Sequence, residues 1–122
     1  MYMNYKDKSD FEVNCKLNVL VGNMPSDWFL LKTDCGDIPC HKIDGDTVFC
    51  EYKHFIDSWA DIGPLIEEHE VTIEFDASES GSHRWCNVSS IQGGPPIDYS
   101  KNPKRAAAIC IIMKLEAEHD KP

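Results

Sequence analysis

Two adjacent cations, Lys104 and Arg105, follow the pair Asn102-Pro103, which is typical of the start of a helix. The first turn of a helix carries free backbone N–H groups and the positive end of the helix dipole, so it attracts anions. Cations at this place therefore need a negative partner. The simpler interpretation is a carboxylate of this chain, and the alternative is a phosphate of a ligand.

Aromatic side chains in two other segments could complete a ligand site beside these cations. One segment, residues 54–59, lies in a loop before a short predicted helix, and the other is the loop that precedes Asn102. Aromatic faces next to cations suit a nucleotide, because bases stack and phosphates form ion pairs. Provided that the 54–59 and 102–105 segments meet in space, the candidate ligand-binding residues are His54, Phe55, Trp59, Tyr99, Asn102, Lys104 and Arg105.

Thiols and imidazoles gather in the middle of the chain, where they raise the question of zinc. Thiolate and imidazole groups can hold zinc in a tetrahedral site. Ligand pairs in such sites have two to four residues between them. Cys35 and Cys40 are at the upper limit of that spacing, and Cys50 and His54 lie on either side of a predicted strand end. We therefore favour ordinary reduced cysteines and predict no metal or cofactor, with zinc left open for Cys35, Cys40, His41, Cys50 and His54.

The sequence lacks the patterns that most often mark an active site. We find no glycine-rich phosphate loop and no nucleophile turn. Cys110 lies in an apolar helix, where a thiol is normally inert packing. The run Glu67, Glu68 and Glu70 is typical of a solvated face. We predict a protein that is not an enzyme and has no catalytic residues.

Net charge and length further limit the class of protein that this sequence can encode. The 122 residues fit one domain, 1–122, and residues 1–8 are predicted to be a flexible arm. The net charge of −9 argues against duplex nucleic acid and against an anionic membrane surface. The start of the chain has no apolar segment typical of a signal peptide, so a cytosolic setting is expected.

The elements that must position these residues form a predicted α+β fold. A capping box at Ser9 and Glu12 begins an N-terminal helix, and Pro64 suits a short central helix. Asp44-Gly45 is a favoured hairpin turn. Turn-rich stretches at 33–47 and 92–101 are predicted to be loops. Four strands (28–32, 47–53, 71–75 and 84–91) should pair into a small antiparallel sheet with helices on one face.

The last predicted helix, from Pro103 to about Ala117, is unusually apolar. Residues 106–113 have no polar side, so this stretch must be covered nearly all round. Its own domain is the favoured cover, and a homodimer through the C-terminal helix is the alternative.

Three patches of the sequence resemble one known family. The stretch 10–14 after a tyrosine-containing start, the stretch 59–66 and the ending 102–107 are similar to NinX-type phage proteins, which are encoded among the accessory genes of lambdoid and related phages. Residues 33–50 depart from that family's pattern. The resemblance implies a phage origin and the host cytoplasm, and it carries over no catalytic residue.

The first functional hypothesis is a non-catalytic bacteriophage accessory protein that acts in counter-defence by binding and sequestering a phosphate-bearing nucleotide signal. The alternative is an acidic protein–protein modulator of a host replication, transcription or defence complex, acting as a nucleic-acid mimic. The expected partner is thus a nucleotide-like small ligand or a host protein.

Overall fold

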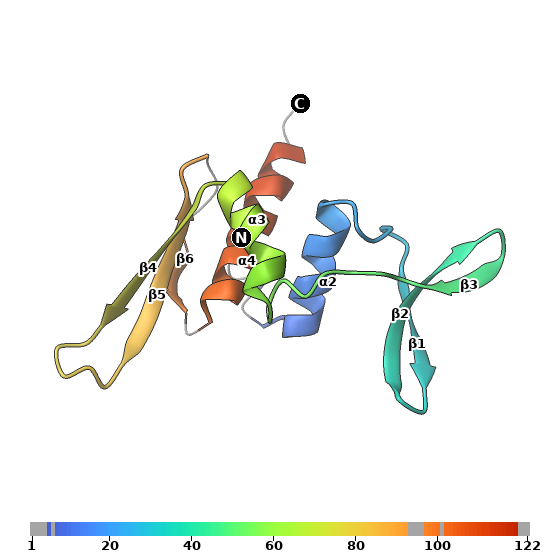
Figure 1. Cartoon of the computed structure of the whole chain (residues 1–122), viewed down its shortest axis with the longest axis horizontal. Helices are drawn as coiled ribbons and strands as arrows, with labels where there is room; N and C mark the ends of the chain where they lie inside the picture. Colours follow the sequence, from blue (N-terminus) through green and yellow to red (C-terminus); the bar gives the residue numbers. More distant parts are fainter. Residues whose placement is uncertain (1–4, 6, 93–96, 101, 120–122) are drawn as a thin grey trace.

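The computed structural model describes residues 5, 7–92, 97–100 and 102–119, and for 97–100 only the backbone. The elements in chain order are α2 (Asp10–Leu20), β1 (Phe29–Thr33), β2 (Gly36–Ile43), β3 (Asp46–Phe49), α3 (Trp59–Glu68), β4 (Val71–Ala77), β5 (Arg84–Ser90), β6 (Ile97–Ser100) and α4 (Pro103–His119). The helices lie in the middle of the molecule, with one sheet on either side (Figure 1). The predicted α+β class is confirmed.

The strands form two antiparallel sheets rather than the single sheet that the sequence suggested. One has the order β1-β2-β3 and the other the order β4-β5-β6. Helix α4 packs on β4, β5 and β6, as well as on α2 and α3. The sheet β1-β2-β3, called the projecting sheet below, stands apart from these helices (Figure 1).

Two strands, β2 and β6, lie where the sequence predicted turns and a loop. Strand β2 is the centre of the projecting sheet although it contains Pro39. The Cys50 N–H donates to the Pro39 carbonyl at 2.9 Å, so the backbone polar atoms of Pro39 face the point just beyond Phe49, where β3 ends. The missing N–H of proline is therefore directed at this end of β3, so the pairing of β2 with β1 loses no bond.

Helix α4 contains the longest buried stretch among the described residues. All eight residues from Ala106 to Met113 are at most 5% exposed. They are covered within one chain by α2, α3 and the sheet β4-β5-β6. The apolar sequence of this helix is thus explained without a second copy, and a homodimer is not needed to cover it. Among the described residues, no helix is long and apolar enough to span a membrane.

Two predicted helix starts, those of α2 and α4, and one predicted turn are confirmed, whereas α3 begins at Trp59, in the predicted loop, and Pro64 lies inside the helix rather than at its start. The Ser9 hydroxyl accepts the Glu12 N–H at 3.1 Å and caps α2. Asn102 Oδ1 accepts the N–H groups of Lys104 and Arg105 at 3.0 and 3.2 Å. Asp44 and Gly45 both have positive φ, as a tight hairpin turn requires.

Helix α2 holds the chain as it returns from the projecting sheet. Asn18 Nδ2 donates to the Lys53 carbonyl at 2.9 Å, and Asn18 Oδ1 accepts the Lys53 N–H at 2.8 Å. Asn14 bonds the same carbonyl at 2.9 Å and accepts the Phe55 N–H at 2.8 Å. Both amides are buried. They give the extended segment the hydrogen-bond partners that a neighbouring strand would supply.

Part of the predicted flexible arm 1–8 is packed on the body. The Tyr5 side chain is 9% exposed and belongs to the main core. The Arg105 guanidinium donates to the carbonyls of Tyr5 and Lys8 at 2.9 and 2.6 Å. These contacts hold the described residues of the arm against the start of α4, although the sequence there is polar.

Candidate functional site

The start of α4 brings two of the predicted ligand residues together. Lys104 Nζ lies 4.8 Å from the centre of the Trp59 ring, in a cation–π contact. Trp59 is the first residue of α3 and is 48% exposed. The 54–59 and 102–105 segments therefore do meet in space. The backbone N–H groups of Lys104 and Arg105 are already bonded to the Asn102 cap.

The negative partner of Arg105 is internal. Its guanidinium lies 2.7 Å from a carboxylate oxygen of Asp10, in the first turn of α2. It also holds the two carbonyls of the N-terminal segment described above. With only 17% of its side chain exposed, Arg105 ties three parts of the chain together. This arrangement leaves Lys104 as the cation that faces outward at the helix start.

The other predicted ligand residues do not join Trp59 and Lys104 in one pocket. Phe55 is 2% exposed and packs in the main core. The exposed His54 ring lies 5.1 Å from the ring of Tyr52. The backbone of Tyr99 is in β6, and its side chain lies outside the described residues.

The residues left open for zinc are spread over different surroundings. Cys35 is exposed in the turn between β1 and β2, whereas Cys40 is buried in the middle of β2. Cys50 packs with Cys15 and Met24 at the root of the projecting sheet. Among the described residues, no three His, Cys, Asp or Glu side chains gather closely enough to hold a metal ion.

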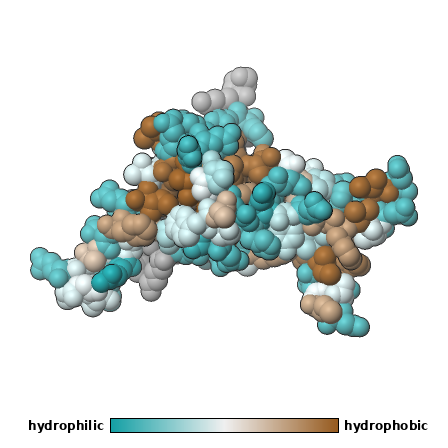
Figure 2. All heavy atoms as spheres, in the orientation of Figure 1, coloured by the Kyte–Doolittle hydropathy of each residue, from teal (hydrophilic) through white to brown (hydrophobic). Residues whose placement is uncertain are grey.

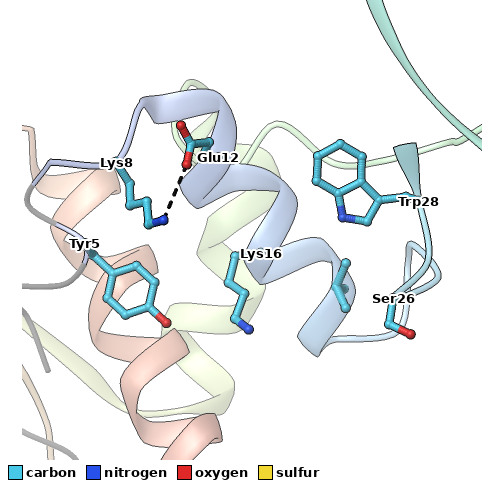
Figure 3. Close-up of a pocket in the computed structure, with 7 residues that line it drawn as sticks. Tyr5, Lys8, Glu12, Lys16, Ser26 and Trp28 are labelled. Atoms are coloured by element: carbon cyan, nitrogen blue, oxygen red, sulfur yellow. Dashed lines mark ion pairs between the residues drawn. The ribbon is translucent and has the colours of Figure 1, made fainter. Parts of the chain in front are cut away.

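A groove of about 430 Å³ crosses the outer face of α2 (Figure 3). Tyr5 flanks it on one side and Trp28 on the other, with Lys8, Glu12 and Lys16 between them. This groove thus combines aromatic rings with cations. The sequence predicted that combination at residues 54–59 and 102–105 instead. The sequence signal was Lys8 just before α2 and Lys16 on α2, a pattern that also fits ordinary surface charge.

The cations of this groove already form ion pairs with carboxylates of the chain. Lys8 pairs with Glu12 at 3.7 Å, and Lys16 pairs with Glu116 at 3.6 Å. The Tyr5 hydroxyl also donates to the Glu116 carboxylate. Burial and this hydrogen bond raise the pKa of Tyr5, so its hydroxyl keeps its proton. The groove is therefore close to neutral, and a phosphate would compete with two internal carboxylates.

The projecting sheet carries an unusual amount of exposed apolar surface (Figure 2). Phe49 is 63% exposed, and four further aliphatic side chains are between 37% and 48% exposed: Leu30, Leu31, Ile43 and Val48. The strand register places Leu31 and Phe49 on one face and the other three on the opposite face. No helix among the described elements covers either face.

Acidic hairpin turns flank this apolar surface at both ends of the sheet. Asp34 and Asp37 lie at the turn from β1 to β2, and Asp44 and Asp46 lie at the turn from β2 to β3. The only lysines in the strands are Lys32 and Lys42. An apolar middle between acidic ends is the pattern of a protein-binding surface rather than of a catalytic cleft.

Comparison with known protein families, with curated proteins and with solved structures finds no significant match for this chain. The resemblance to NinX-type phage proteins therefore stays a prediction.

Proposed function

We propose that this chain is a non-catalytic binding protein of the phage accessory type, which modulates a host protein complex through the projecting sheet. The observation that carries this proposal is the exposed apolar surface on both faces of that sheet. Exposed apolar patches of this kind mark interaction sites on soluble proteins. The phage setting rests on the sequence resemblance alone.

The partner that fits this surface is a protein with an apolar centre and basic residues around it. The turns and strands of the sheet hold four aspartates against two lysines, so opposite charge in the partner would be attracted at both ends. A second copy of the chain would place the same aspartates close to each other. Duplex DNA would be repelled by them.

The contribution of a single side chain can be estimated from Phe49. Full burial of a phenylalanine side chain contributes about 2–3 kcal/mol. With 63% of its surface exposed, Phe49 has most of that gain still available to a partner. Replacing it with serine is expected to weaken binding by roughly tenfold, since about 1.4 kcal/mol corresponds to a factor of ten.

The test begins with a photo-crosslinking amino acid at Leu31, on the same face as Phe49, in host cells, with the same group at Glu67 on α3 as a control. A partner that crosslinks at Leu31 only is then purified, and its affinity is measured by calorimetry. We expect Phe49→Ser to weaken binding tenfold or more, and added salt to weaken it further. Equal affinity of the wild type and a Leu31→Ser, Phe49→Ser double variant would exclude the projecting sheet as the interface.

A second candidate function is sequestration of a phosphate-bearing nucleotide signal. It is supported by the contact between Lys104 and the half-exposed Trp59 ring, which offers a stacking face and a cation. Calorimetry against cyclic dinucleotides and ADP-ribose tests it, with Lys104→Glu as the variant that abolishes binding. Arg105 is kept unchanged, because its loss would disturb the fold. If none of these ligands produces heat on titration, this candidate function is excluded.

A further inference from the structure

We propose that the cavity between α2, α3 and α4 binds a small, neutral, mostly apolar molecule that carries a carbonyl-type hydrogen-bond acceptor. This cavity, called the α3 cavity below, has a volume of about 420 Å³. That size lies in the range of small-molecule sites, which are typically apolar with a few placed polar groups. The proposal does not depend on the partner of the projecting sheet.

The walls of the α3 cavity are extensions of the main core. Leu20 and Val21 come from the end of α2, Leu65 from α3 and Leu115 from α4, and Phe55 also contributes. The first four are only partly buried and pack against the buried core. A ligand that fills the cavity would cover apolar surface that the chain itself leaves open to water, at a gain of about 25 cal/mol per Å².

One fixed hydrogen-bond donor, His69, lies in the wall. Lys114 Nζ is 2.8 Å from His69 Nδ1, and both side chains are buried. An ammonium group has donors only, so Nδ1 must be the acceptor and carry no proton. In the neutral imidazole the proton is then on Nε2. Burial, followed by the charge of Lys114, lowers the pKa of His69, which favours this neutral form.

Among the side chains that the structure describes, none accepts a hydrogen bond from Nε2 of His69. The Glu68 carboxylate lies 3.8 Å from Nε2, too far for a hydrogen bond. The backbone fixes the residue, since its N–H donates to the Leu65 carbonyl at 2.9 Å and its own carbonyl accepts the Ser90 hydroxyl. His69, which lines the cavity, therefore holds an N–H donor in a set orientation, with the ammonium group of Lys114 at its other ring nitrogen.

The charges at the rim favour a neutral ligand. Lys53, Asp61 and Glu68 line the cavity, so one cation faces two carboxylates. An anion placed at His69 would be repelled by Glu68 at close range. An ammonium ligand could not use the Nε2–H, because neither group can accept a hydrogen bond. A ketone or amide oxygen matches the donor without either cost.

Three probes with the same ring separate these possibilities: cyclohexyl methyl ketone, cyclohexanecarboxylate and cyclohexylmethylamine. Titrations are followed by NMR, through the backbone amides and the imidazole nitrogens of ¹⁵N-labelled protein. We expect the ketone to shift the Nε2 resonance of His69 and the amides of Leu65 and Leu115. We also expect it to bind at least fivefold more tightly than either charged probe.

A cavity-filling variant gives the second readout. Ala60 is exposed on α3 and lines the cavity, so Ala60→Trp should fill it without changing the core, and the ketone affinity should fall at least tenfold. Glu67→Trp, on the same helix but outside the cavity, is the control and should bind as the wild type does. The proposal is overturned by absence of shifts at these residues, by a charged probe that binds as tightly, or by an Ala60→Trp variant with unchanged affinity.

Discussion

Asn18 is the side chain whose removal tests the architecture most directly. It is fully buried and forms hydrogen bonds with both backbone groups of Lys53. In Asn18→Ala the Lys53 carbonyl keeps its bond from Asn14, but the Lys53 N–H loses its partner. A buried polar group left unpaired costs about 1–3 kcal/mol, and lost side-chain packing adds to this, so we expect a loss of about 2–4 kcal/mol.

The assay combines equilibrium unfolding in urea with hydrogen exchange. Asn18→Ala should lower the unfolding midpoint, and the Lys53 and Phe55 amides should exchange faster than the loss of global stability explains. Asn23→Ala is the matched control, because Asn23 is exposed and its side chain donates to Asn18 Oδ1 at 3.1 Å, and not to the backbone of Lys53. A change of less than 0.5 kcal/mol in Asn18→Ala, on the order of a surface substitution, would refute the role of the amide pair.

Three further predictions concern acidity, thiols and the core. Burial, followed by the charge of Lys114, lowers the folded-state pKa of His69, so the unfolded chain binds the His69 proton more readily. The free energy of unfolding should therefore be highest above about pH 6.5 and decrease as the pH falls further. In Lys114→Met, thermal unfolding should show a smaller decrease, and an equal decrease would contradict the contribution of the Lys114 charge. Cys35, which is exposed, should react with a thiol reagent within seconds, whereas Cys15, whose pKa burial raises to about 11, should react only after unfolding, as peptide mapping would show. Ile111→Ala, at a fully buried site, should cost about 2–5 kcal/mol in urea unfolding, and a loss below 1 kcal/mol would mean that α4 is not central.

Local signals in the sequence predicted local structure well. Ser9, Asn102 and the Asp44-Gly45 turn each act through backbone groups within three residues, so their chemistry is visible in the sequence itself. The burial of residues 106–113 was also predictable, because a helix without a polar side needs cover all round. Strand β2 was missed because its proline and glycine suggest turns, and only the end of β3 beside Pro39 makes that proline harmless.

The candidate sites depended on contacts between distant residues, which periodicity does not encode. Asp10 is the partner of Arg105, 95 residues away. The sequence was consistent both with a carboxylate of the chain and with a phosphate of a ligand as that partner. Lys114 offered one signal, a cation directly after an apolar stretch, but its partner His69 lies 45 residues earlier. The sequence therefore predicted which chemical groups would matter and not how they pair.

The segment from Lys53 to Phe55 connects the two proposed sites. Lys53 and Phe55 line the α3 cavity, and the segment begins directly after Cys50 and Tyr52 at the root of the projecting sheet.

The amides of Asn14 and Asn18 fix this segment, so loosening it should affect both sites, whereas a change at either site alone should remain local. We expect Asn18→Ala to weaken the binding of both the ketone probe and the protein partner. Phe49→Ser should weaken only the binding of the partner, and Ala60→Trp only the binding of the probe. Calorimetry on the three variants measures this pattern. If Asn18→Ala unfolds the segment, as its amide exchange would reveal, and yet both affinities stay unchanged, then the amides of Asn14 and Asn18 position neither site and the connection through residues 53–55 is wrong.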